Sequence, residues 1–351
     1  MRIAVDAMGG DNAPLVNVDG AIAAAREFGI ASLLVGKTAE LERLIADSGY
    51  RGDRIGVVDA PEFVTMDDPA TAAIRKKRNS SIRVAANCVR DGRAAGLVSA
   101  GHTGAAMVSA KMVIGTIQGV DRPALAAVVP NLSGHSLLLD VGANPDARTQ
   151  HFEEFAVMGS IYAQLVFGKP NPSVGLMSIG EEDSKGNVST REAFKALKLT
   201  GLNFVGNVEG RDVFNGSVDV IVTDGFTGNV ILKVSEALAD MVENMLREEI
   251  KKTLKASVGF LLSRSAFRSF KSRIDYSEYG GAPLLGVKGC VIICHGSSSA
   301  KAVKNAIRLA AEFSRQRLAE RIQSSIAALR THGTPAGEPD GARSSGREAR
   351  S

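Results

Sequence analysis

The sequence predicts a doubly wound α/β fold, in which a mostly parallel sheet is sandwiched between layers of helices. Short apolar segments alternate with longer amphipathic segments through most of the chain, beginning with residues 2–6, 14–28 and 32–36. Most of the apolar segments show no polar alternation, which is typical of strands covered on both faces. Small polar loops follow directly after six of the expected strands, as they do in parallel sheets that bind ligands.

The expected strands are short and regularly spaced. They are residues 2–6, 32–36, 54–60, 96–100, 136–144, 173–180, 202–207, 218–224 and 289–294. The expected helices lie between them, at residues 14 to about 28, from 38, after 104, about 150 to 167, after 188, from 229, and about 298 to 329. Pro14 suits the first turn of its helix, where the missing N–H costs nothing.

Length and composition indicate a folded chain. Of 351 residues, 44% are hydrophobic and 23% are charged, which argues against wholesale disorder. We expect one α/β catalytic domain over residues 1–330 and a disordered tail over 331–351, where no large apolar residue occurs. Three cysteines cannot form a disulfide framework, and Cys290 and Cys294 fit a core strand, so a cytoplasmic location is expected. No apolar run is long enough to span a membrane.

Positive charge is concentrated in one segment. Residues 247–273 contain eight Lys or Arg and two acidic residues, a net charge of +6, and the rest of the chain has a net charge of −2. This distribution argues against a general nucleic-acid coat and favours a localised contact with an anionic partner.

The basic segment over residues 246–279 also has apolar residues at helical spacing. We expect two amphipathic helices joined at an apolar corner at residues 259–262, with Phe267 and Phe270 on the second helix. Its contact residues would be Lys251, Lys252, Lys255, Leu261, Leu262, Arg264 and Arg268. An anionic membrane, an acidic protein and a second copy of this chain remain alternative partners.

The six polar loops are the candidate ligand site. They occupy residues 6–14, 99–105, 140–146, 178–187, 223–229 and 294–299. Because the carboxyl ends of parallel strands meet at one edge of a sheet, we expect all six loops to face one crevice.

Two of these loops have the form of an anion site. Each combines glycines, a threonine and the start of a helix, a pattern that favours phosphate or carboxylate and that also occurs in plain helix caps. The residues are Gly101, His102, Thr103 and Gly104 in one loop, and Asp224, Gly225, Thr227 and Gly228 in the other. The dinucleotide fingerprint, the P-loop, zinc-enzyme histidine spacings and the serine nucleophile elbow are absent from the sequence, so no cofactor or metal is expected.

Several motifs together resemble one family. MRIAVDAMGGDNAP, SAGHTGA, DVGAN, GEEDSKGN, VEGRD and VDVIVTDGFTGNVILK resemble the bacterial phosphate acyltransferases of phospholipid synthesis, from Met1 to about Arg330. The resemblance implies the α/β fold of isocitrate and isopropylmalate dehydrogenases and of phosphotransacetylase. It also implies transfer of an acyl group from acyl carrier protein to inorganic phosphate, and delivery of the acyl phosphate to a glycerol-3-phosphate acyltransferase. A homodimer peripherally associated with the membrane is the expected form.

The resemblance also assigns site residues. It places Lys185 and Asn229 in the catalytic centre, where Lys185 would neutralise anionic charge and Asn229 would donate to the carbonyl oxygen. Loop residues 101–104 would hold phosphate, and the weaker candidates for orienting it are Asp11, Asn12, Asn144 and Ser297. From the residues alone, a solvated lysine is the better interpretation of Lys185, and a histidine hydrogen-bonded within its own loop is nearly as good an interpretation of His102 as a catalytic one.

Other functions remain open at this point. A phosphotransacetylase shares the fold and the phosphate chemistry but takes the acyl group from coenzyme A, whereas the basic segment suits the acidic surface of a carrier protein. A decarboxylating dehydrogenase of the isocitrate class is disfavoured, because no cluster of arginines and paired aspartates is visible. A catalytically silent, membrane-associated scaffold is the alternative from a different class.

Overall fold

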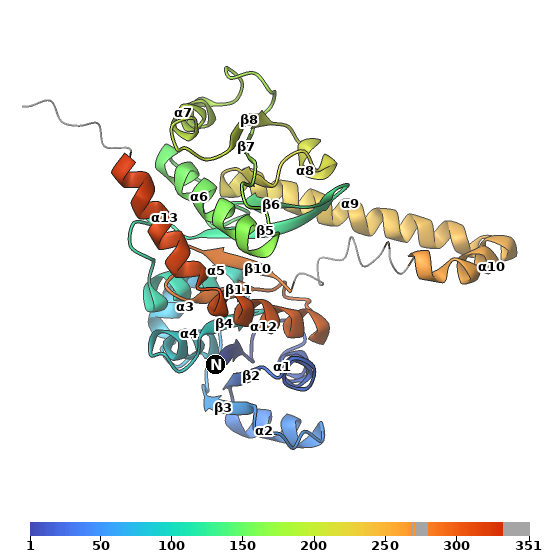
Figure 1. Ribbon diagram of the computed structural model, residues 1–351. Coiled ribbons are helices and arrows are strands. Elements are labelled where there is room, and N and C mark those ends of the chain that lie inside the picture. The colour runs from blue at the N-terminus through green and yellow to red at the C-terminus, as the bar shows by residue number, and fades with distance from the viewer. Residues whose placement is uncertain (268–269, 271–279, 333–351) are drawn as a thin grey trace, which may run out of the picture.

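One sheet of eleven strands forms the centre of the molecule. A computed structural model describes residues 1–267, 270 and 280–332 (Figure 1). The strands are β1 Arg2–Asp6, β2 Ala31–Gly36, β3 Ile55–Asp59, β4 Gly96–Ser99, β5 Ala124–Asn131, β6 Gly134–Leu139, β7 Val174–Met177, β8 Phe204–Val208, β9 Val220–Val222, β10 Ala282–Leu285 and β11 Cys290–Ile293. Their order across the sheet is β3-β2-β1-β4-β11-β10-β5-β6-β9-β7-β8.

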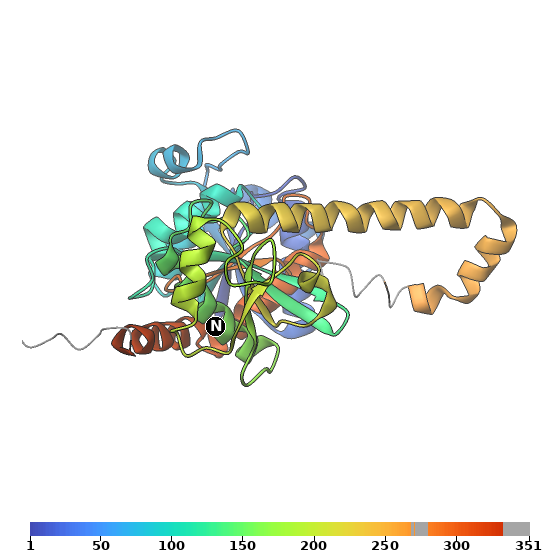
Figure 2. The ribbon, with the colours of Figure 1, turned by 90° about the horizontal axis from the view of Figure 1, so that it is seen from above.

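Helices cover both faces of this sheet (Figure 2). They are α1 Leu15–Phe28, α2 Thr38–Asp47, α3 Ala70–Lys76, α4 Ser81–Arg90, α5 Thr103–Ser109, the π-helix η1 Ala110–Ile114, α6 Thr149–Val166, α7 Val188–Leu197, α8 Asp212–Asn215, α9 Gly225–Lys251, α10 Leu254–Leu262, α12 Ala300–Arg315 and α13 Leu318–His332. The predicted α/β class and the mostly parallel, helix-flanked sheet are confirmed.

Alternation along each strand divides the core into two layers. In β1, Ile3 and Val5 face one hydrophobic cluster and Ala4 faces the other. Helices α1, α2, α6, α7, α12 and α13 pack on the first face, and α3, α4, α5, η1, α8 and the start of α9 pack on the second. The unbroken apolar runs in the sequence therefore correspond to strands buried on both sides.

The sheet has two halves that run in opposite directions. Strands β3, β2, β1, β4 and β11 are parallel to one another, and so are β6, β9, β7 and β8. Between the halves, β10 pairs antiparallel with β11 and with β5, and β5 pairs antiparallel with β6. Three successive antiparallel pairings reverse the strand direction from one half to the other.

The sequence analysis did not identify β5, β10, α3, α4 or α8. Strand β5 reads ALAAVVPN, a mix of alanines and valines without alternation, and β10 contains only four residues, one of them proline. The prediction of a single last helix at residues 298–329 was wrong. The helix breaks at Arg317, whose φ is 54°, and gives α12 and α13. Helix α13 continues to His332, and the rest of the predicted tail, 333–351, lies outside the described residues.

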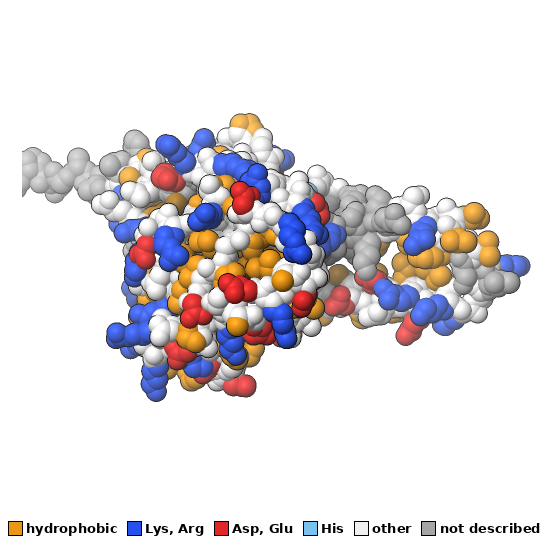
Figure 3. Space-filling model, turned by 90° about the horizontal axis from the view of Figure 1, so that it is seen from below, with side chains coloured by type: hydrophobic (Ala, Val, Ile, Leu, Met, Phe, Trp, Pro, Cys, Tyr) orange, Lys and Arg blue, Asp and Glu red, His pale blue; other side chains and the backbone are white. Residues whose placement is uncertain are grey.

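Helix α9 projects far beyond the body, and α10 lies at its outer end (Figure 1). The predicted interruption at Gly259 was wrong. The helix instead breaks at residues 252–253, where Thr253 caps α10, and α10 continues through Gly259 to Leu262. Figure 3 shows hydrophobic side chains on this arm beside lysines and arginines; Leu261 and Leu262 are 65% and 81% exposed. Arg268 lies outside the described residues, and none of the described helices has the length and apolar content needed to cross a bilayer.

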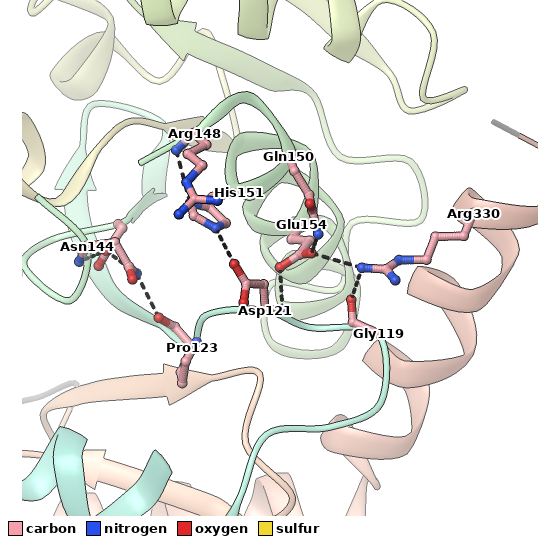
Figure 4. Close-up of polar contacts among 10 residues, drawn as sticks. Gly119, Asp121, Pro123, Asn144, Arg148, Gln150, His151, Glu154 and Arg330 are labelled. Atoms are coloured by element: carbon pink, nitrogen blue, oxygen red, sulfur yellow. Dashed lines mark hydrogen bonds and ion pairs between the residues drawn. The ribbon is translucent and has the colours of Figure 1, made fainter. Parts of the chain in front are cut away.

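A polar network fixes the segment that leads into β5 (Figure 4). The Asp121 carboxylate accepts a hydrogen bond of 2.8 Å from the His151 ring, and this bond lowers the pKa of Asp121. Buried Glu154 accepts from the backbone N–H of Asp121 at 3.0 Å and pairs with Arg330 of α13 at 3.2 Å. Helices α6 and α13 therefore hold residues 119–123 in place.

Candidate active site

A cavity of about 580 Å³ lies against β5 and β10, between the two halves of the sheet. Its apolar floor includes Leu125 and Val128 of β5 and Ala282 of β10. The rim is polar and includes Asn229 at the start of α9 and Ser297 before α12. A cavity of this size, with an apolar floor and polar groups at its rim, is typical of a small-molecule site.

The six polar loops do not converge on one edge of the sheet, so that prediction was wrong. Because the halves run in opposite directions, the loops after β1, β4 and β11 lie at one edge and those after β6, β7 and β9 lie at the other. Loops from both edges still border the cavity, since β10 contains four residues and spans only about 13 Å. Those that border it follow β4, β6, β9 and β11.

In the loop after β4, only Thr103 lines the cavity. The His102 side chain caps its own helix, because its Nδ1 accepts from the Ala105 N–H at 3.3 Å. Gly101 is buried, and Gly104 packs on the His102 ring. Thr103 is therefore the one residue of this predicted phosphate loop that lines the cavity.

The loop after β1 supports its neighbours. The Ser99 hydroxyl donates to buried Asp6 at 2.8 Å, and burial raises the pKa of the Asp6 carboxyl against the effect of this bond. The backbone N–H of Asp11 donates to the carbonyl of Gly296 at 2.8 Å, which joins this loop to the one after β11. Asp11 and Asn12 are exposed and do not line the cavity.

The loop after β6 is organised by a fully buried carboxylate, Asp140. Its oxygens accept hydrogen bonds from the backbone N–H groups of Leu125, Gly142, Ala143 and Asn144 and from the Asn144 side-chain amide. The same amide nitrogen donates to the Pro123 carbonyl at 2.8 Å (Figure 4). Asn144 therefore ties this loop to β5 and is not among the cavity-lining residues.

The loop after β9 leads into α9, and the first turn of α9 packs closely against the Asp140 loop. Asp224 caps α9, accepting from the Thr227 N–H and hydroxyl, both at 2.8 Å. A Cβ at Gly228 would lie 1.9 Å from the Asp140 carbonyl oxygen, and one at Gly225 would lie 2.8 Å from the Asn144 nitrogen. These glycines and the cap hold α9 in place, and the next residue, exposed Asn229, lines the cavity.

The loop after β11 contributes His295 and Ser297, whose side chains lie 2.8 Å apart. Ser299 caps α12 by accepting from the Ala302 N–H at 3.3 Å. Cys294 borders the cavity but is buried, and burial raises its thiol pKa to about 12. The thiol is therefore protonated at neutral pH and is a poor nucleophile.

Lys185 lies apart from this cavity. It is exposed in the loop after β7, where its backbone N–H donates to the Glu182 carbonyl at 3.0 Å. The structure therefore brings together Thr103, Asn229 and Ser297 and leaves Lys185 outside the lining.

Among the cavity-lining residues that the sequence analysis did not name individually as site residues, His295 lies in the expected loop 294–299, and the charged residues Lys233 and Glu236 lie outside all six loops. Lys233 and Glu236 follow Asn229 by four and seven residues, a spacing that places all three on one face of a helix. That spacing was visible in the sequence, but the orientation of α9 relative to the cavity was not.

Comparison with known proteins identifies the family. A family model described as "Fatty acid synthesis protein" matches residues 1–321. "Phosphate acyltransferase" from Geotalea uraniireducens is 54% identical over 327 residues, 92% of this chain and 94% of the relative. The protein of the same name from Geobacter sulfurreducens is 52% identical over 332 residues, 93% of this chain and 96% of the relative. The chain belongs to the phosphate acyltransferase family.

Solved structures show the fold of this family member to be that of the phosphotransacetylases. A phosphotransacetylase from Streptococcus pyogenes aligns with a TM-score of 0.64 and 18% identity, covering 90% of this chain and 94% of that one. The EutD phosphotransacetylase from Staphylococcus aureus gives 0.61 and 16%, with the same coverage.

We predict that Gly228→Ala destabilises the protein, because its methyl group would collide with the Asp140 carbonyl. Overpacking of this kind costs about 3 kcal/mol. The matched control is Gly259→Ala in α10, where no atom lies within 4 Å and the substitution gains about 0.5–1 kcal/mol. Unfolding in guanidinium chloride measures both; equal midpoints for the two variants would contradict the close approach.

Proposed function

We propose that this chain transfers an acyl group from acyl carrier protein to inorganic phosphate, giving an acyl phosphate and the free carrier. The observation that carries the proposal is the cavity, where the starts of α5, α9 and α12 border an apolar floor. Helix N-termini favour anions, and an apolar floor suits an acyl chain. Membership of the phosphate acyltransferase family supports the same reaction.

The chemistry requires placement more than covalent catalysis. A phosphate oxygen attacks the thioester carbonyl carbon, the new C–O bond forms, and the C–S bond then breaks to release the carrier's thiolate. In this proposal Asn229 donates to the carbonyl oxygen as it gains negative charge, and Thr103 and Ser297 orient phosphate. Phosphate is itself the nucleophile, which agrees with the protonated state of Cys294.

We further propose that Lys185 acts when loop 178–187 closes over bound substrate. In its present position the loop is held by a hydrogen bond of 2.8 Å from the Asn207 amide to the Glu182 carbonyl and by exposed ion pairs of Asp183 with Lys198 and of Glu181 with Arg211. Exposed ion pairs stabilise little, so closure would have to break mainly the one hydrogen bond. The lysine would then add positive charge from outside the cavity.

Acyl carrier protein is the proposed donor because Lys251, Lys252, Lys255 and Arg264 are exposed on the arm and suit an acidic surface. A phosphotransacetylase-type reaction with acyl-CoA is the second candidate, favoured by the shared fold. A catalytically silent scaffold would not need a cavity bordered by Asn229 and Thr103.

The exposed apolar side chains of α9 and α10 support a proposed homodimer and a proposed contact with the membrane surface. Along α9, six apolar side chains at helical spacing are 47–68% exposed: Phe226, Val230, Val234, Leu238, Met241 and Met245. We propose that this stripe packs against a second copy of the chain. The tip of α10 then contacts an anionic bilayer, where the amphiphilic product passes to a glycerol-3-phosphate acyltransferase.

Activity should depend on inorganic phosphate and on acyl carrier protein. Incubation of the protein with acyl-ACP and phosphate is expected to give an acyl phosphate that hydroxylamine traps, without nicotinamide or ATP. Acyl-CoA serves as the alternative donor in a parallel assay. Product from acyl-CoA alone would favour the second candidate, and a stable acyl-enzyme would contradict direct attack by phosphate.

Asn229→Ala is expected to lower kcat about 100- to 1000-fold, the effect of removing one oxyanion donor. Lys185→Ala is expected to fall in the same range if the loop closes as proposed. Melting temperature should stay near that of the parent protein, because both side chains are exposed. Lys195→Ala is the control, because Lys195 is also an exposed lysine, in α7. Normal turnover in Lys185→Ala would contradict a catalytic role for Lys185 and leave it a solvated surface lysine.

Membrane association is tested by replacing Leu261 and Leu262 together with Glu. The double variant should lose binding to anionic vesicles and keep its activity in solution. Binding of the parent protein should weaken with salt, since each basic residue near the surface contributes ~1 kcal/mol. Leu132→Glu is the control, because Leu132 is 82% exposed on the body. Unchanged vesicle binding of the double variant would contradict membrane contact by Leu261 and Leu262 and would favour a protein partner for this segment.

A further inference from the structure

A charged pair on α9 lies within the cavity. Lys233 and Glu236 both line it, and Lys233 Nζ lies 3.6 Å from a Glu236 carboxylate oxygen. Their side chains are 58% and 33% exposed. At this distance the two groups attract by charge without a close hydrogen bond, and the lysine ammonium carries three N–H donors.

The pair shares a helix face with Asn229. At 3.6 residues per turn, residues 229, 233 and 236 fall on one face of α9, and the exposed apolar stripe of residues 226 to 245 is centred about 120° around the helix from them. The cavity-lining face of α9 therefore carries Asn229, Lys233 and Glu236 beside Leu232, and most of the apolar stripe lies on an adjacent face. This division separates Lys233 from the ordinary solvated lysines of the arm.

Lys233 can supply the positive charge that a bound phosphate dianion requires in this cavity. Among the described residues that line the cavity, Lys233 is the only lysine or arginine. A phosphate dianion next to an apolar floor loses much of its hydration and requires compensating positive charge. Helix N-termini provide only partial charges, whereas an ammonium provides a full one.

We infer that Lys233 is the cationic contact for phosphate and that Glu236 positions the ammonium before phosphate binds. This inference rests on the proposed function and extends it by naming a substrate-binding residue. An exposed helical ion pair with no other role would contribute little to folding and nothing to catalysis.

The test compares Lys233→Gln, Lys233→Arg and Glu236→Gln by steady-state kinetics. For Lys233→Gln we expect kcat/KM for phosphate to fall about 100-fold, with KM for acyl-ACP unchanged. Lys233→Arg, which keeps the charge, should recover most of the loss, and Glu236→Gln should raise mainly the KM for phosphate. Arg308→Gln is the control, because Arg308 forms a helical ion pair with Glu312 at 3.0 Å on α12 and does not line the cavity.

A second measurement separates this inference from the proposed reaction. Phosphate alone should raise the melting temperature of the parent protein above that in chloride of equal ionic strength, and Lys233→Gln should abolish the rise. If no acyl phosphate forms but this Lys233-dependent rise persists, the proposed reaction fails and the phosphate contact stands. A rise that survives in Lys233→Gln, or a change confined to the KM for acyl-ACP, would overturn the inference.

Discussion

The close approach of α9 to the buried Asp140 carboxylate is the constraint on which the site depends. Asp140 gathers four backbone N–H groups and one side-chain amide, which folds its loop tightly enough for α9 to begin against it. Glycine at 228 permits the contact, and Asp224 caps the helix that starts there. The direction of α9 across the cavity follows from this contact, and so do the positions of Asn229 and Lys233.

The reversal of strand direction in the middle of the sheet explains why loops from opposite edges share one cavity. Two strands in antiparallel pairings, the four-residue β10 and the eight-residue β5, separate the parallel halves and form the cavity floor. Polar contacts fix the segment before β5: His151 and Glu154 of α6 bind Asp121, and Glu154 also pairs with Arg330 of α13. The Asn144 side chain ties Pro123, just before β5, to the Asp140 loop (Figure 4). The end of the floor at which β5 begins is thus fixed by polar contacts to α6, α13 and the Asp140 loop.

Local sequence signals predicted much of this architecture and part of the site. The buried parallel strands and their polar loops are visible because each strand is a continuous apolar run bounded by small residues. Strand direction is set by long-range pairing, so β5 and β10, and with them the division of the loops between two edges, were missed. Thr103, Asn229 and Ser297 were identified because they lie in small polar loops that directly follow strands. Lys233 was missed because its place in the site depends on which face of α9 lines the cavity, and the sequence does not show that.

The central claim is that phosphate binds where the starts of α5, α9 and α12 border the β5–β10 floor. The position of phosphate in a crystal structure grown with it tests this claim most directly. The account predicts a phosphate within hydrogen-bond distance of Thr103 or Ser297. A phosphate held instead by the Lys185 loop, with the cavity empty, would contradict it.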